Sequence, residues 1–358
     1  MLSSMYKFFL IFLFSPIVIF AQIPDFNKLS GKGMRCWKYI KTKEDKSNLH
    51  LLQETFTKNF VEMPDENAPD YIPKTIHWIW LGPKDFPEKS KENITTWIKN
   101  HPGWTFKLWT DRPRDLPFSN LNINIIQPDY LGEYSDLYTD SDNWGEKSDL
   151  LRLMILQKEG GLYVDHDARA FQSFANFHKS YNFYTGLIFP ADFGLYSNLL
   201  IRNSIVGACP DHEITHVALG KTRERWTKIG KQFNGNSSET VRKRVVHRTF
   251  LCFNEAVLEA MQDPSFTGII FPAGFFTKES NKFGIYADED MTGSWYREEM
   301  NYYEVYLHKR VHKLMKRLHL FMIISSILLF INFVFIILLF KKHGFKKPLS
   351  KRLSSRAT

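Results

Sequence analysis

The sequence contains only three cysteines, and their spacing matches no metal-binding or disulfide framework. Cys36, Cys209 and Cys252 lie far apart in the chain, so they allow one disulfide at most and supply no zinc site. The sequence also lacks internal repeats and any glycine-rich loop that would hold phosphate groups. These absences argue against a disulfide scaffold, a zinc protein and a P-loop phosphotransferase.

The body of the chain lacks an excess of positive charge, although the whole chain carries a formal net charge of +9. Twelve Lys/Arg residues lie in two stretches without acidic residues, 309–317 and 341–358, which leaves residues 1–308 with a net charge of −3. Both stretches flank a long apolar segment. The basic residues therefore belong to the surroundings of a membrane segment, and we expect no nucleic acid among the partners.

Both ends of the chain are hydrophobic. Residues 8–20 form an apolar stretch before Ala21, which predicts a secretory signal peptide over residues 1–21, with an uncleaved N-terminal anchor as the alternative. Residues 320–340 contain no charge, and these 21 residues are long enough to cross a bilayer as a helix. Residues 341–358 then form a basic tail, for which the positive-inside rule favours the cytosol.

A cytosolic tail places the body of the protein in the lumen of the secretory pathway, at an ER or Golgi membrane. In that compartment the sequons at Asn93 and Asn236 are candidate glycosylation sites. The fate of the N-terminal segment decides whether the protein crosses the membrane once or twice.

Residues 71–308 alternate between strand and helix patterns, and the more polar residues 22–70 are expected to form a stem that leads into this domain. We expect strands within 74–82, 104–111, 123–126, 162–164, 181–189, 200–208 and 268–276, and helices within 86–101, 143–159, 211–230 and 239–262. Such alternation predicts an α/β fold with a mostly parallel sheet.

Two aspartates stand at the end of one predicted strand. Asp165 and Asp167 follow an apolar run, and alternation along an extended segment would place both carboxylates on one face, with His166 opposite. Carboxylates repel each other unless a cation or strong donors satisfy them. A Mn²⁺ or Mg²⁺ ion that carries a diphosphate does so, and a solvated turn with a capping Asp is the alternative.

The preceding helix carries Asp149 and Arg152, which lie three residues apart and so share one face. They could present an acceptor and a donor to a polyhydroxyl ligand, or form an ordinary surface ion pair. Trp80 ends the first strand, where its ring could stack on a nucleobase or pack in the core. His77 lies on the opposite face of that strand and is expected to be a core histidine.

A polar loop is expected over residues 284–299. In it, Glu289 or Asp290 could add a further oxygen ligand to the metal, and Ser294 and Trp295 could close over a diphosphate. A charged loop with one aromatic anchor is the alternative.

Three segments, IPKTIHWIWLG, NWGEKSDLLRLMILQKEGGLYVDHDARAF and GSW, together resemble the DxD-containing glycosyltransferase sugar-binding superfamily. This superfamily includes initiating α-1,6-mannosyltransferases, mannosyl-inositolphosphoceramide synthases and the glucosylating clostridial toxins. The resemblance is dense over residues 71–175 and loose over 265–296. It implies a GT-A fold, a single nucleotide-binding α/β domain, and metal-dependent transfer from a nucleotide sugar with retention at the anomeric carbon.

The resemblance also implies roles for the acidic residues. Asp167 would be the direct Mn²⁺ ligand, and Asp165 would contact the ribose and the metal shell. Asp149 and Arg152 would hold the donor sugar. Many members have a histidine before the Ser-Trp pair, whereas this chain has an acidic stretch, so Glu289 is the candidate for a further metal ligand, as in toxin-like relatives.

Two other regions match the parts of the family that bind the nucleotide. The backbone and ring near Ile79 and Trp80 would receive the nucleobase, and Trp295, which follows Ser294, would contact the diphosphate.

These expectations describe a membrane-anchored, metal-dependent retaining glycosyltransferase. A catalytic domain followed by a transmembrane helix is similar to the arrangement of mannosyl-inositolphosphoceramide synthases, which favours mannose from GDP-mannose, with a UDP-hexose as the alternative donor. The expected acceptor is a glycolipid or glycan at the membrane. Retention allows either a carboxylate nucleophile or front-face attack. The alternative function is a non-catalytic, membrane-anchored carbohydrate-binding protein with the same fold.

Overall fold

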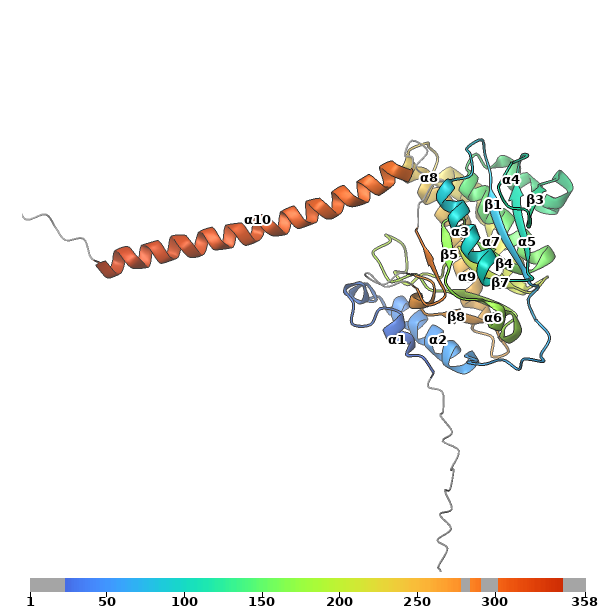
Figure 1. The fold of residues 1–358 in the computed structure, drawn as a ribbon, viewed down its shortest axis with the longest axis horizontal. Helices are drawn as coiled ribbons and strands as arrows, with labels where there is room; N and C mark the ends of the chain where they lie inside the picture. Colours follow the sequence, from blue (N-terminus) through green and yellow to red (C-terminus); the bar gives the residue numbers. More distant parts are fainter. Residues whose placement is uncertain (1–22, 278–283, 291–301, 344–358) are drawn as a thin grey trace, which may run out of the picture. The chain divides into compact units, whose positions relative to one another are not determined.

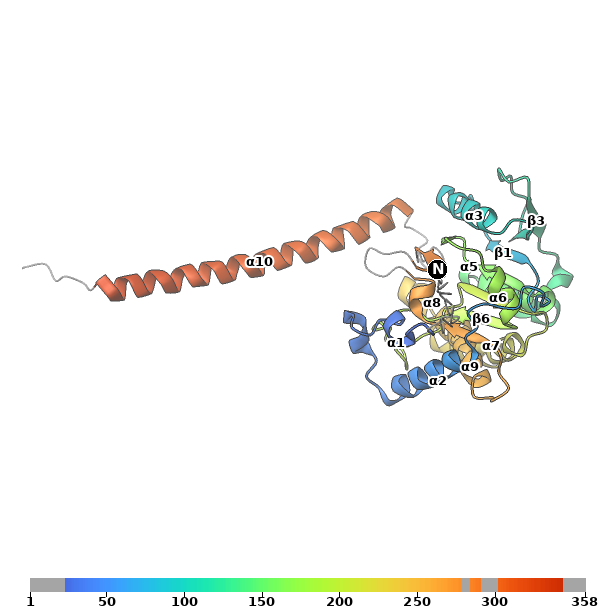
Figure 2. The same ribbon diagram turned by 60° about the horizontal axis from the view of Figure 1, so that its bottom comes forward.

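A computed structural model describes residues 23–277, 284–290 and 302–343, with the side chains of only part of the last range. The chain divides into an α/β unit that ends at Tyr296 and a second unit, residues 297–358, which contains the long helix α10 (Tyr302–His343). Figures 1 and 2 show the α/β unit from two directions.

A seven-stranded sheet lies at the centre of the α/β unit, with the strand order β3-β2-β1-β4-β7-β6-β8. Its strands are β1 (Thr75–Trp80), β2 (Thr105–Thr110), β3 (Leu121–Ile125), β4 (Gly161–Val164), β6 (Phe183–Gly186), β7 (Ile205–Ala208) and β8 (Ile269–Phe271). Neighbouring strands are parallel except at β7, which runs antiparallel to both β4 and β6. The predicted α/β fold with a mostly parallel sheet is confirmed.

Helices surround this sheet, and each predicted helix is present. The α-helices of the α/β unit are α1 (Phe26–Leu29), α2 (Lys43–Asn59), α3 (Glu88–Asn100), α4 (Ser135–Asp140), α5 (Trp144–Glu159), α6 (Ala175–Ser180), α7 (Glu213–Gln232), α8 (Ser238–Val245) and α9 (Leu251–Ala260). Short 3₁₀ turns cover Arg35–Tyr39, Pro128–Tyr134 and Ala273–Phe275, and a π-turn, Val246–Phe250, joins α8 to α9.

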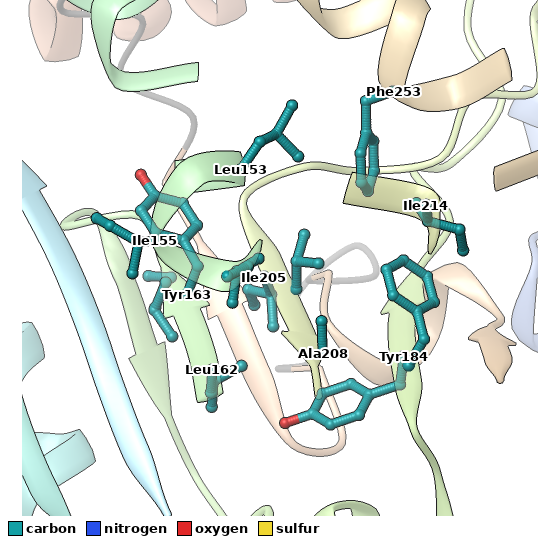
Figure 3. Packing of buried hydrophobic residues seen from close by; sticks show 14 of the residues in the cluster. Leu153, Ile155, Leu162, Tyr163, Tyr184, Ile205, Ala208, Ile214 and Phe253 are labelled. Carbon is teal, nitrogen blue, oxygen red and sulfur yellow. The ribbon is translucent and has the colours of Figure 1, made fainter. Parts of the chain in front are cut away.

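The core beside β4 is built from both strands and helices. All four residues of β4 are buried, as the continuous apolar run predicts for a central strand. Figure 3 shows the packing of Leu153 and Ile155 from α5, Leu162 and Tyr163 from β4, Tyr184 from β6, Ile205 and Ala208 from β7, Ile214 from α7 and Phe253 from α9. Each fully buried aliphatic side chain contributes about 1.5–3 kcal/mol, so this packing fixes the position of β4 and of the residues that follow it.

Two glycines connect α5 directly to β4. Gly160 and Gly161 have φ angles of +63° and +98°, which only glycine adopts easily. A Cβ on Gly160 would lie 2.6 Å from the Pro210 ring, and one on Gly161 would lie 2.7 Å from the carbonyl oxygen of Thr75. Both positions therefore require glycine, and the short connection places the end of β4 next to the helix that carries Asp149.

The region predicted as a stem packs on the domain instead. Phe26 of α1, and Leu52 and Phe56 of α2, belong to the hydrophobic core, and α2 lies beside β8 in Figure 1. The buried carboxylate of Asp45 accepts a hydrogen bond from the N–H of Asn198 at 2.8 Å. Residues 26–59 are therefore part of the α/β unit. In α2 the sequence hides this contact, because its buried apolar residues Leu52 and Phe56 lie in an otherwise polar helix.

Three buried histidines are kept neutral by burial, and each uses one ring nitrogen as a hydrogen-bond donor and the other as an acceptor. His77, predicted to be a core residue, donates from Nε2 to the carbonyl of Gly160 and accepts at Nδ1 from the indole of Trp109. His101 and His178 each use their two ring nitrogens in the same way, one as donor to a carbonyl and one as acceptor. Burial lowers the pKa of His77 and His101 to about 4 and that of His178 to about 3.

Acid is expected to destabilise the folded protein through these histidines. Below pH about 6.5 the unfolded chain binds protons that the folded chain does not, so the free energy of unfolding falls until the pH nears the folded pKa. Wild type should lose about 2 kcal/mol more than His101→Gln between pH 7.5 and 5.0. Urea unfolding at both pH values measures this difference. The exposed His50→Gln is the control, and equal losses for wild type and His101→Gln would contradict the prediction.

The second unit contains a candidate membrane span. Arg317–Leu339 has a mean hydropathy of 2.9, none of it is buried, and it is long and apolar enough to cross a membrane. It overlaps the predicted span, residues 320–340. The predicted signal peptide and most of the basic tail lie outside the described residues.

Candidate active site

Asp165 and Asp167 lie in a tight turn after β4 rather than in an extended segment. The N–H of Ala168 donates to the carbonyl of Asp165 at 3.0 Å and closes the turn. The turn still directs both carboxylates to one side, because one oxygen from each of Asp165, Asp167 and Glu289 lies within 4.8 Å of the other two. The three predicted metal ligands are therefore brought together.

A two-stranded sheet carries Glu289 to this turn. Strand β5 (Ala168–Ala170) pairs antiparallel with β9 (Ala287–Glu289), so that Glu289 lies opposite Ala168, directly after Asp167. The N–H of Asp290 donates to the carbonyl of Asp167 at 3.2 Å. The region predicted as a polar loop thus contains a strand, and the strand explains why Glu289 rather than Asp290 faces the aspartates.

Two carboxyl groups of the acidic cluster, those of Asp165 and Glu289, have raised pKa values. Burial raises the pKa of Asp165, and the nearby carboxylate of Asp167 adds to this, against the effect of Arg152. Burial also raises the pKa of Glu289 to about 8, with contributions from Asp167 and Asp165. Three carboxylates this close offer the hard oxygen ligands that Mn²⁺ and Mg²⁺ prefer. The residues present therefore fit the divalent cation that the sequence predicted.

Asp149 and Arg152 form a buried ion pair, not a surface one. Arg152 Nη2 lies 2.8 Å from Asp149 Oδ1, and Arg152 Nη1 lies 3.3 Å from Asp165 Oδ1. The guanidinium carbon lies 4.4 Å from the ring centroid of Tyr163, whose hydroxyl donates to Asp165 at 2.6 Å. Arg152 therefore connects Asp149 to Asp165, the first aspartate of the DxD turn. Together with Tyr163 these residues form one polar network.

Asp149 has two further donors that the sequence analysis missed. Asn203 Nδ2 donates to Asp149 Oδ1 at 3.0 Å, and the hydroxyl of Thr249 donates to Oδ2. Thr249 lies in the π-turn, a distortion that is frequent at functional sites. The irregular turn between α8 and α9 gave no signal in the sequence, where both helices read as one.

The segment before β7 also contributes to the site. The carbonyl of Asn203 accepts from Arg152 Nη1, and the carbonyl of Ser204 accepts from the N–H of Asp165 at 2.8 Å. The sequence analysis treated residues 200–208 as one strand. The polar triplet Arg202-Asn203-Ser204 inside that apolar stretch was the available signal for a functional segment.

Helix α3 supports the turn from its other side. Ser90 Oγ lies 2.8 Å from His166 Nδ1, and Asn93 Nδ2 donates to the carbonyl of His166 at 3.2 Å. Trp97, one turn further on, donates to the carbonyl of Ala168 at 2.9 Å. Because these positions share one face of the helix, α3 holds the backbone of the turn and turns His166 away from the carboxylates.

This contact overturns one of the predicted glycosylation sites. Asn93 is only 2% exposed and its amide is engaged by the turn, so a glycan cannot be attached there in the folded protein. The sequon at Asn236 is exposed, in the segment before α8. The motif is a local signal, whereas the burial of Asn93 arises from tertiary packing.

The predicted nucleotide-binding residues are only partly described. Ile79 is buried, and Trp80 is half-buried with its indole N–H donating to the carbonyl of Lys84 at 2.9 Å. The Trp80 ring meets that of His166 edge-on, with 4.8 Å between centroids, so it lies beside the DxD turn. Ser294 and Trp295 lie outside the described residues.

The other two D-x-D sequences have structural partners. Asp140 accepts from the indole of Trp226 at 2.6 Å, and Asp142 pairs with Arg244 at 3.0 Å. Asp288 pairs with Arg169 at 3.3 Å across the small sheet. Only the pair at residues 165 and 167 is joined by a third carboxylate among the described residues.

Residues 87–184 match the family described as "Glycosyltransferase sugar-binding region containing DXD motif". The matched segment runs from α3 to β6 and includes Asp149, Arg152 and both aspartates of the turn. It ends before Glu289. The match confirms, for this segment of the chain, the resemblance to the DXD-containing sugar-binding region of glycosyltransferases.

Individual relatives are similar over part of their length. The chain is 30% identical over 126 residues to Subversion of eukaryotic traffic protein A of Legionella pneumophila, covering 30% of this chain and 19% of that protein. It is 28% identical over 144 residues to mannosyl phosphorylinositol ceramide synthase SUR1 of Saccharomyces cerevisiae, covering 40% of this chain and 33% of that protein. The chain thus spans a third or less of these relatives.

A solved structure, the PaToxG glycosyltransferase, superposes on the chain with a TM-score of 0.40 and 17% identity. The superposition covers 63% of this chain and 79% of that chain.

Proposed function

We propose that the protein is a membrane-anchored, metal-dependent retaining glycosyltransferase that transfers a hexose from a nucleotide sugar to a glycolipid or glycan. The observation that carries this proposal is the cluster of Asp165, Asp167 and Glu289, within 4.8 Å of one another and joined to the buried Asp149–Arg152 pair. Nucleotide-sugar transfer needs both parts, a site for the charged diphosphate and a site for the sugar.

Asp165, Asp167 and Glu289 would hold the divalent ion. When bound, the ion supplies positive charge that stabilises the departing nucleoside diphosphate. The partial burial of the cluster strengthens this effect, because electrostatic interactions are less screened away from water.

Asp149 and Arg152 are placed to hold the donor sugar. Asp149 accepts hydrogen bonds from Asn203 and Thr249 and forms an ion pair with Arg152, whereas an ionised carboxylate can accept about four hydrogen bonds. The carboxylate therefore retains acceptor capacity for a sugar hydroxyl. The three protein contacts fix its orientation.

GDP-mannose is the proposed donor, with UDP-hexoses as alternatives. This choice is supported by the similarity to mannosyl phosphorylinositol ceramide synthases and by the helix α10, which would keep the domain at a membrane where glycolipid acceptors lie. In this proposal the catalytic domain lies in the lumen of the ER or Golgi.

Donor hydrolysis tests the proposal. The full chain in detergent is incubated with GDP-mannose, UDP-galactose, UDP-glucose or UDP-N-acetylglucosamine, each with Mn²⁺ or with EDTA, and released nucleoside diphosphate is measured. Release of one diphosphate with Mn²⁺ only is the expected result and identifies the donor. Absence of both release and Mn²⁺-dependent nucleotide binding would contradict it and favour a non-catalytic carbohydrate-binding protein.

A further inference from the structure

Two neighbouring side chains in the segment before β7 hold Glu289. Arg202 Nη1 donates to Glu289 Oε2 at 3.0 Å, and Ser204 Oγ donates to the same oxygen at 2.6 Å. These residues are two apart and flank Asn203, which holds Asp149. One short segment therefore organises the carboxylate nearest the DxD pair and the carboxylate of the proposed sugar site.

Both side chains donate to the same oxygen of Glu289, Oε2. No described residue donates a hydrogen bond to Oε1 of Glu289. With Oε2 held by two donors, the orientation of the carboxylate is restricted, and Oε1 is the oxygen to which none of the described residues donates. Glutamate has three side-chain torsions, so without such donors its carboxylate would sample several orientations.

The burial of Arg202 lowers the stability of the folded protein in one respect. Its side chain is 1% exposed, and its Nε–H has no acceptor among the described residues. Its second terminal nitrogen, Nη2, donates to the hydroxyl of Thr277. A buried donor without a partner costs about 1–3 kcal/mol, so the chain retains this guanidinium at a cost.

We propose that Arg202 and Ser204 are positioning residues that fix Oε2 of Glu289 and thereby present Oε1 to the divalent ion. This inference rests on the proposed function, because it assigns Glu289 to the metal site. It adds to that function a prediction about the free protein: the carboxylate of Glu289 is already oriented for the ion before any nucleotide sugar binds. Residues that orient metal ligands typically account for about 10–100-fold in metal affinity.

Mn²⁺ binding to the full chain in detergent, without a sugar nucleotide, tests the inference. Electron paramagnetic resonance of free Mn²⁺ gives the Kd. Ser204→Ala is expected to raise this Kd by about 10-fold, since it removes one of the two donors. Ser204→Thr retains a hydroxyl and should restore binding.

Ser141→Ala is the matched control. Ser141 is also buried and donates to a buried glutamate, Glu146 Oε2, at 2.7 Å, but this pair lies outside the carboxylate cluster. Both variants lose the same kind of hydrogen bond, so a purely structural effect would appear in both. Only Ser204→Ala should weaken Mn²⁺ binding, while thermal unfolding reports the stability of each.

A double-mutant cycle shows whether Ser204 acts through Glu289. If it does, Ser204→Ala has no further effect on the Kd in a Glu289→Ala background. Independent, additive effects would overturn the inference, and so would a wild-type Kd in Ser204→Ala when Asp167→Ala abolishes binding. In that second case the proposed metal site itself stands. If wild type binds no Mn²⁺, the proposed function fails and this inference fails with it.

Discussion

Replacement of Asp167 by alanine is expected to lower Mn²⁺-dependent donor hydrolysis by at least about 100-fold, since losing an orienting residue alone costs 10–100-fold in metal affinity or activity. Asp167 is one of three carboxylates within 4.8 Å, and removing it leaves two ligands, one of them the Arg152-paired Asp165. Activity is measured as nucleoside diphosphate release at saturating donor, with Mn²⁺ varied. The loss should persist at every Mn²⁺ concentration at which wild type is saturated.

Asp142→Ala is the matched control for this variant. Asp142 belongs to another D-x-D sequence, and its side chain is 72% exposed and paired with Arg244. Exposed ion pairs contribute about 0–1 kcal/mol, so this change should leave activity and stability nearly unaltered. If Asp167→Ala hydrolysed the donor at the wild-type rate, or if Asp142→Ala lost as much activity as Asp167→Ala, the proposed role of the DxD turn in catalysis would be contradicted.

Replacement of Asp149 by alanine is expected to cost about 3–5 kcal/mol of unfolding free energy, the usual effect of breaking a buried ion pair. The change leaves the guanidinium of Arg152 buried with Asp165 as its remaining acidic partner, and it removes the acceptor for Asn203 and Thr249. Urea unfolding measures the loss. Asp149→Asn preserves the shape of the side chain and separates catalysis from folding, because donor hydrolysis should fall in it even where the protein remains folded.

The surface pair of Asp136 and Arg223 provides the comparison for Asp149. Their atoms lie at nearly the same distance, 2.9 Å, but the Asp136 side chain is 61% exposed. Asp136→Ala should therefore cost less than about 1 kcal/mol. A similar small cost in Asp149→Ala would show that the buried pair does not contribute to the stability of the site.

The strongest part of the site could be predicted because its signals are local. A capped apolar helix, a Gly-Gly pair and a short apolar strand each have a recognisable pattern, and together they place Asp165 and Asp167 at a strand end. The same patterns located every strand of the main sheet. Sequence patterns are reliable for α5 and β4 because the helix is long and the strand is continuously apolar.

The rest of the site depends on contacts that no local pattern reports. Strands β5 and β9 have three residues each, which is too short for an alternating pattern to be detected. The pairing of these strands, which places Glu289 beside the turn, could therefore not be predicted from the sequence. The same reason applies to α2, where polar composition masked the few residues that reach the core. Asn93 carries a sequon, and only its contact with His166 shows that the sequon is inaccessible.

The reversed direction of β7 has a consequence for where this site can draw its residues. In a fully parallel sheet, only segments that follow strands reach the carboxyl edge, and these are the loops that vary between relatives. Because β7 runs antiparallel to β4, with Ile205 opposite Val164, the segment that enters β7 arrives at that edge as well. The site is thus lined from both chain directions, and residues 202–204 are tied at both ends, to β7 at their exit and to the end of β6 at their entry, where the N–H of Arg202 donates to the carbonyl of Gly186 at 2.8 Å and Ile201 pairs with Leu187. Changes in length in the connecting residues 189–196 can therefore alter what surrounds the site while both anchors keep Asn203 and Ser204 in place.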